Sequence, residues 1–262
     1  MKKWHFITVL LLTTLMTANT FADRRYFGRL YMANTLPKGA LEFELWNTAK
    51  IEKYAGYYYR FQPRFEFEYG ITDKLSGSIY MNFEQTTAEG NDFSSSPLGF
   101  ESTSLELKYR FTNPGETFID PAVYFEFSYG GSEIDYEGKA IFSRRLGENF
   151  ITALNLTSEI ERNVIESELE SSLELTAGLM YEFNSNFAAG LEFRNHRNYE
   201  KMYEKFDNQA SFVGPTINLQ TDKFYFTLNL LAQVGGSPAS KNSLDLRGHE
   251  KYEVRTILGI NL

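Results

Sequence analysis

The feature that most constrains the fold of this chain is a regular alternation of apolar and polar residues. Residues 64–84 read RFEFEYGITDKLSGSIYMNFE. On both sides of GITDK the apolar residues recur at every second position, first Phe65, Phe67 and Tyr69, then Leu75, Ile79, Met81 and Phe83. Successive side chains of a β-strand point to opposite faces. The spacing therefore predicts two antiparallel strands joined by a tight turn, with one apolar face and one polar face.

The same alternation continues to the C-terminus in about twelve runs between residues 41 and 262. Short connections alternate along the chain with longer polar ones. The short ones are GITDK, TNPGET, RRLGEN, NSN and QTDK, and the longer ones include TTAEGNDFSSSPLG, NYEKMYEKFDNQ and GGSPASKNSLDLRG. A short helix over residues 199–207 is one interpretation of the second long connection. Short turns at one end and long loops at the other are typical of outer-membrane barrels. We therefore predict an all-β fold in which residues 39–262 form a transmembrane antiparallel up-and-down β-barrel.

The direction in which the apolar face points decides between a soluble and a membrane barrel. No Asp, Glu, Lys or Arg occupies a position assigned to the apolar face, and a soluble barrel of this size would enclose more apolar space than side chains fill. Beyond the N-terminus no run approaches the ~20 apolar residues of a membrane helix. Aromatic residues gather beside the short turns, as in an interfacial girdle. They are Tyr69, Tyr109, Phe111, Phe118, Phe150, Tyr181, Phe183, Phe187 and Phe224.

The N-terminus carries a targeting signal. The stretch MKKWHFITVLLLTTLMTANTFA has two lysines, a short apolar core and small residues before Asp23. This pattern predicts a secretory signal peptide over residues 1–22, cleaved after Ala22. The irregular stretch 23–38, which carries three arginines, is predicted to be a periplasmic tail, with insertion into the barrel lumen as the alternative.

The last strand and two short stretches carry a resemblance to known proteins. Residues 252–262 (YEVRTILGINL) alternate up to Leu262 and resemble the C-terminal signal that the barrel-assembly machinery recognises in Gram-negative outer-membrane proteins. Such signals usually end in Phe, so Leu262 departs from the pattern. LPKGALEFELW and EYGITDKLSGSIYMNF resemble a group of poorly characterised outer-membrane barrels often described as candidate transporters. The resemblance implies the outer membrane as location, lipid and lipopolysaccharide as partners, and passage of small solutes.

Composition excludes several other functions. The chain has no cysteine, which removes disulfides, thiolate metal sites and a cysteine nucleophile. It has only three histidines, and we predict neither a metal nor a cofactor. The formal net charge of −8 argues against nucleic acid as a partner, because nucleic acids bind basic surfaces.

The polar face of the strands is the predicted lining of the lumen. Its charged positions include both signs with an excess of acids, which favours a narrow pore for cations and neutral solutes over anions. The alternative is that these charges only pair with one another, and pairing with carboxylates is expected for Arg60 and Arg64. The candidate lining or solute-binding residues are Arg60, Arg64, Glu66, Glu68, Glu106, Lys108, Arg110, Glu126, Glu174, Glu192, Arg194 and Arg255.

Two further classes of function remain as alternatives to transport. The first is a structural or surface-interaction barrel with a closed lumen. The second is an outer-membrane hydrolase, which needs a serine and a histidine within hydrogen-bond reach. His196 is the candidate histidine at a strand end, but spacing identifies no serine partner. Paired acids such as Glu66 and Glu68 recur along many strands, which favours lumen lining over catalysis. We therefore predict no catalytic residues and no enzymatic activity.

Overall fold

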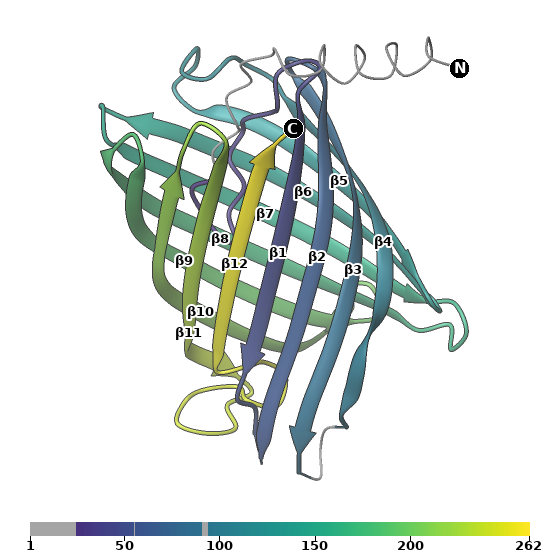
Figure 1. Cartoon of the computed structure of the whole chain (residues 1–262). Coiled ribbons are helices and arrows are strands. Elements are labelled where there is room, and N and C mark those ends of the chain that lie inside the picture. Colours follow the sequence, from purple (N-terminus) through teal and green to yellow (C-terminus); the bar gives the residue numbers. More distant parts are fainter. Residues whose placement is uncertain (1–24, 55, 91–93) are drawn as a thin grey trace, which may run out of the picture.

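The computed structural model describes residues 25–54, 56–90 and 94–262, so the predicted signal peptide lies outside the described residues. Twelve antiparallel strands form one closed barrel, in which β1 pairs with β12 and every other strand pairs with its neighbours in the chain (Figure 1). The predicted all-β up-and-down barrel is confirmed. The strands are β1 (Leu41–Ile51), β2 (Tyr57–Thr72), β3 (Leu75–Glu89), β4 (Ser96–Arg110), β5 (Asp120–Gly130), β6 (Glu133–Leu146), β7 (Phe150–Asn163), β8 (Leu169–Asn184), β9 (Phe187–Glu200), β10 (Lys205–Gln220), β11 (Phe224–Ser237) and β12 (Tyr252–Asn261).

We call the end of the barrel that carries the C-terminus the terminal end, and the opposite end the loop end. The terminal end has the turns 73–74, 111–119, 147–149, 185–186 and 221–223. The loop end has the connections 52–56, 90–95, 131–132, 164–168, 201–204 and 238–251. The predicted contrast in length is therefore weaker than expected, because the strands extend into the polar stretches and only 238–251 is long.

Residues 199–207 do not form the short helix that the sequence suggested. β9 continues to Glu200 and β10 begins at Lys205, and the three turn residues Lys201, Met202 and Tyr203 have positive φ angles of 51°, 54° and 68°. A left-handed turn closes this hairpin, since paired strands leave too few residues for a helical turn. No helix in the described part of the chain is long and apolar enough to cross a membrane.

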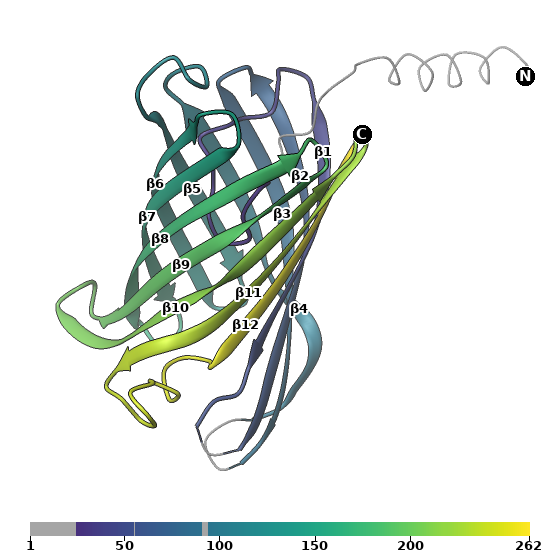
Figure 2. The same ribbon diagram turned by 90° about the vertical axis from the view of Figure 1, so that its left-hand side faces the viewer.

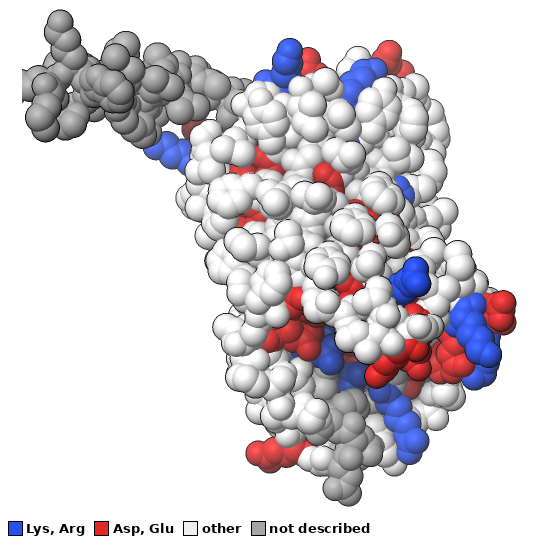
Figure 3. Space-filling model, turned by 90° about the vertical axis from the view of Figure 1, so that its right-hand side faces the viewer, with Lys and Arg blue, Asp and Glu red and all other residues white. Residues whose placement is uncertain are grey.

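The apolar face of the strands points outward along the whole barrel. Ile79, Leu107 and Leu156 on three different strands are each 50% exposed, although their polar neighbours in the chain are buried. In Figure 3 the wall is mostly uncharged, and the charged side chains gather towards the loop end. At the terminal end, aromatic rings contact one another: Tyr109 and Phe111 lie 5.3 Å apart, and Tyr181 and Phe183 lie 4.9 Å apart. The outer surface thus has the two features expected of a wall that faces lipid.

The inner face contains large apolar groups as well as charges, which the alternation did not predict. Residues 25–38, called here the inserted segment, run inside the barrel near the terminal end (Figures 1 and 2). Two buried clusters hold the segment against the wall. One contains Tyr31 and Ala33 with Trp46, Ala122, Tyr124, Ile141, Tyr225 and Ile257. The other contains Tyr26, Phe27 and Leu30 with Ile151, Ala153, Met180 and Ala188. The described part of the stretch 23–38, residues 25–38, thus lies inside the lumen, and residues 23 and 24 lie outside the described residues.

Candidate solute site in the barrel lumen

The inserted segment is held by two buried carboxylates of the barrel wall. The backbone N–H groups of Gly28 and Arg29 donate to the carboxylate of Glu192 at 2.7 and 2.8 Å. The Arg29 guanidinium forms a two-point ion pair with Glu253, whose side chain is fully buried. Charge-assisted bonds of this kind are about twice as strong as neutral ones. The segment is therefore anchored electrostatically as well as by apolar packing.

Further hydrogen bonds fix the backbone of the inserted segment. The Tyr31 N–H donates to Asn155 Oδ1 at 2.7 Å, and Asn155 Nδ2 donates back to the Tyr31 carbonyl at 2.9 Å. The N–H of Ala33 donates to Ser143 Oγ at 3.0 Å. Because the segment has no regular secondary structure, these wall side chains take the place of a sheet or helix as partners for its buried backbone groups.

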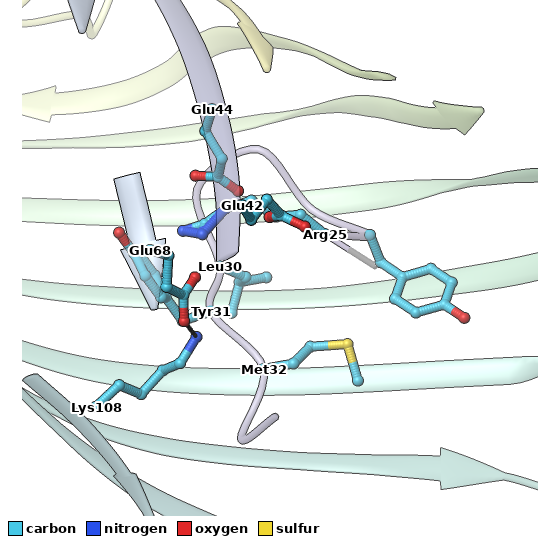
Figure 4. A pocket seen from close by; sticks show the side chains of 9 residues that line it. Arg25, Leu30, Tyr31, Met32, Glu42, Glu44, Glu68 and Lys108 are labelled. Atoms are coloured by element: carbon cyan, nitrogen blue, oxygen red, sulfur yellow. Dashed lines mark ion pairs between the residues drawn. The ribbon is translucent and has the colours of Figure 1, made fainter. Parts of the chain in front are cut away.

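Little space remains between the segment and the wall. The cavity shown in Figure 4 has a volume of about 20 Å³, which is room for about one water molecule. The guanidinium of Arg25 lies over the rings of Tyr31 and Trp46 at 4.1 and 4.2 Å. Lys108 and Glu68, which line the same cavity, form an ion pair of 3.4 Å (Figure 4). The part of the lumen that contains the inserted segment, called here the terminal half, is thus closed.

The remainder of the lumen, called here the loop half, is hollow. Three cavities of about 230, 150 and 130 Å³ lie there. The first and third share Glu159, and the second and third share His196 and Asn198. Charged and polar side chains line all three, so these cavities are suited to water and polar solutes rather than to apolar ligands.

The family of the chain follows from its sequence. A family model described as a family of unknown function, DUF6662, matches residues 19–141 and 141–262. The chain belongs to DUF6662. Comparison with curated proteins gives no match.

Solved structures show the same fold at low sequence identity. An outer membrane channel of the COG4313 group from Pseudomonas putida F1 is 12% identical, with a TM-score of 0.65 over 88% of this chain and 98% of that one. The NanC porin is 9% identical, with a TM-score of 0.55 over 85% and 100% of the two chains. A KdgM porin in complex with disordered oligogalacturonate is 10% identical, with a TM-score of 0.52 over 84% and 99%. This DUF6662 protein therefore shares the fold of outer membrane channels and porins.

The structure distributes the sequence-predicted lining residues between the two halves. Glu66, Glu68, Glu106, Lys108 and Glu192 are buried in the terminal half, and Arg110 lies at the terminal end of β4, where it donates to the Asp73 carbonyl at 2.7 Å. In the loop half, the cavities are lined by Arg60, Arg64, Glu126, Arg194 and Arg255. Glu174 accepts a bond of 2.6 Å from Arg194.

The arginines of the loop half differ in their partners. Arg194 forms ion pairs with Glu174, Glu250 and Glu253, and Arg60 lies 3.3 Å from Glu84. By contrast, Arg64 donates to the Asn82 side chain at 2.8 Å and lies 4.2 Å from the centre of the Tyr80 ring. The pairing with carboxylates expected for Arg60 and Arg64 is thus found as an ion pair for Arg60, whereas Arg64 bonds an amide.

Several charged residues of the loop half were absent from the sequence-based candidates. Lys50 and Lys53 line the cavity of 150 Å³, and Glu161 and Glu170 line that of 130 Å³. Lys50, Glu161 and Glu170 continue the inward parity of their strands, so the alternation contained the signal. His249 belongs to the connection 238–251, which folds inward, and no local pattern predicts that.

His196 lines two cavities, and its nearest polar neighbours are other nitrogen groups. Its Nδ1 lies 3.3 Å from Arg194 Nη2, and its ring lies 5.5 Å from that of His249. None of the hydrogen bonds in the described part of the chain joins a serine hydroxyl to His196. Within that same part, no group of three or more His, Asp or Glu residues is arranged to hold a metal ion.

Proposed function

We propose that this DUF6662 protein is an outer-membrane channel for small hydrophilic solutes. The observation that carries the proposal is the divided lumen. One half has cavities of about 130 to 230 Å³ that are lined by charges, and the inserted segment fills the other half. The likeness of the barrel to outer membrane channels and porins supports it.

The proposal includes an orientation. Residues 1–22 direct the chain across the inner membrane and are removed after Ala22, and residues 252–262 are read by the barrel-assembly machinery. Lipid and lipopolysaccharide surround the apolar wall. The terminal end then faces the periplasm, as the end with both termini does in barrels of this type, and the loop end faces the outside. Solutes enter through the loop half, whose acidic excess favours cations and neutral solutes.

Passage requires the inserted segment to leave the terminal half, and one glycine offers a way to test this. A Cβ added to Gly28 would lie 2.4 Å from Cβ of Asn229 on β11. Overpacking of this kind costs roughly 1–3 kcal/mol, so Gly28→Val is expected to raise the open fraction roughly tenfold. Planar-bilayer conductance of the full chain measures it, with Gly138→Val as matched control, because nothing lies within 4 Å of a Cβ at Gly138.

The second candidate function is a structural or surface-interaction barrel with a permanently closed lumen. The filled terminal half favours it. The same recordings separate the two candidates: a folded Gly28→Val barrel that conducts no more than wild type would contradict the channel and favour the closed barrel.

A further inference from the structure

The loop half of the lumen carries opposite charges on opposite walls. In the closed ring of twelve strands, β1 lies six strands from β7, and β2 lies six strands from β8, so these pairs face each other across the lumen. The cavity of 150 Å³, called here the basic cavity, is lined by Lys50 near the end of β1, by Lys53 just after β1 and by Arg60 of β2. The cavity of 130 Å³, called here the acidic cavity, is lined by Glu159 and Glu161 of β7 and by Glu170 of β8.

The basic cavity contains a positively charged hydrogen-bond donor that forms no bond with the described residues. The described residues of its lining include four Lys or Arg residues and one carboxylate, that of Glu250. Arg60 and Arg194 are already paired with glutamates, and the Lys53 ammonium donates to the Gly248 carbonyl at 3.2 Å. The Lys50 ammonium has no ion pair or hydrogen bond with the described residues.

His249 adds an independent indication of a ligand at the basic cavity. Its side chain lines this cavity and is 3% exposed, and its Nε2 is buried without a hydrogen-bond partner among the described residues. Burial, together with the neighbouring His196 and Arg194, lowers the pKa of His249 to about 2. The imidazole is therefore neutral, and its Nε2 can donate a hydrogen bond to an anionic group.

The acidic cavity is built from carboxylates in direct cross-strand register. Glu161 of β7 is paired with Asp135 of β6 on one side and with Glu170 of β8 on the other. Glu159 is likewise paired with Glu137. Like charges directly opposite one another destabilise a sheet, and none of the described residues that line this cavity is a Lys or Arg. A cationic group bound there would relieve the repulsion.

The two cavities meet on β9. His196 and Asn198 line both of them, so a solute at this junction has ammonium groups on one side and carboxylates on the other. A simple anion is attracted by the basic wall and repelled by the acidic wall. A simple cation is attracted by the acidic wall and repelled by the basic wall. A solute that carries both charges gains from both walls.

We propose that the loop half binds small zwitterionic solutes, with the carboxylate towards Lys50 and His249 and the cationic group towards Glu161 and Glu170. As the class of solute that the channel admits, this inference rests on the proposed function. The binding itself can be tested separately.

The test uses glycine betaine as zwitterion, with acetate and tetramethylammonium as its two singly charged halves. Isothermal titration calorimetry on the folded full chain in detergent measures all three. Betaine is expected to bind at least about tenfold more tightly than either half, since each wall contributes a charge-assisted contact. Lys50→Met and Glu161→Gln should each weaken betaine binding about tenfold. Lys241→Met and Glu204→Gln, exposed charges of the loop end outside these cavities, should leave it unchanged.

Equal affinities for betaine and its two halves in the wild type would overturn the proposal without any variant. So would betaine binding that survives both Lys50→Met and Glu161→Gln. Failure of the channel has a different signature, because it leaves betaine binding intact while Gly28→Val does not conduct. Conductance without preferential betaine binding rejects only the zwitterion site.

Discussion

The two halves of the lumen are lined by the same types of residue and differ in whether the inserted segment supplies partners to the carboxylates of the wall. In the terminal half, the inserted segment brings donors to the carboxylates: Gly28 and Arg29 to Glu192, and the Arg29 guanidinium to Glu253. In the loop half, Glu161 and Glu170 face a cavity and each other. The number of charges on a strand therefore does not tell whether that part of a barrel is open. What decides it is whether another part of the chain satisfies them.

The ion pair between Arg29 and Glu253 is the most direct way to break this difference. Removing one partner of a buried ion pair leaves the charge of the other uncompensated. Because Arg194 remains near Glu253 and offsets part of that cost, Arg29→Ala is expected to weaken docking of the segment by about 3 kcal/mol. The terminal half then opens. Increased conductance together with protease cleavage within residues 25–38 measures it. Lys38→Ala, at an exposed position, is the control, and equal protection of both variants would refute the anchoring role.

A smaller effect tests whether both halves share one lipid-facing wall. Leu107 faces outward beside the terminal half, and Leu156 faces outward midway along β7. An arginine on the lipid face near the midplane costs about 2 kcal/mol, but much less near the interface. Leu156→Arg should lose this amount in equilibrium unfolding from lipid vesicles. Leu107→Arg, three residues from the end of β4 at the terminal end, and Leu98→Arg, near the loop end, should lose much less. Equal losses at all three positions would contradict the depth profile of a membrane wall.

The smallest effect concerns the charge of the loop half. Burial, with Arg60 and Lys50 nearby and Glu250 opposing them, lowers the pKa of Lys53 to about 8. The amine is thus mostly protonated at pH 7 and mostly neutral at pH 9, so raising the pH removes a positive charge from the lumen. In the Gly28→Val background, the preference for K⁺ over Cl⁻ should rise by about twofold between these pH values. Reversal potentials measure it.

Substitutions at the same position provide the controls for the pH effect. Lys53→Arg keeps its charge at both pH values and should show no change, and Lys53→Met should show the higher cation preference already at pH 7. A pH effect of the same size in all three proteins would assign the titration to another group.

The fold could be predicted from sequence because a period of two fixes the face of every residue once one is placed. Phe67 and Ile79 were predicted to lie on the same apolar face of a hairpin, and they are directly paired between β2 and β3. The inserted segment could not be read in this way, because residues 25–38 have no period and their partners, such as Asn155, lie far along the chain.

For the candidate site too, sequence predicts what depends on neighbouring residues and does not predict what depends on contacts far along the chain. The inward parity of Arg60, Arg64 and Glu126 follows from their own strands, and these residues line cavities of the loop half. Whether such a position is covered depends on Trp46 or Tyr225, large inner residues that hold the segment, and on the inward fold of the connection that carries His249. These are long-range contacts that no alternation encodes.

The inserted segment is continuous with β1, and the two are joined through Gly39, whose φ of 85° suits a residue without a side chain. A group that closes the lumen while remaining tethered to it cannot diffuse away. Its return is an intramolecular event, governed by the effective concentration that a short linker imposes rather than by the amount of protein in the membrane. Each barrel therefore contains one inserted segment of its own. In the proposed channel, closure after an opening needs no second molecule.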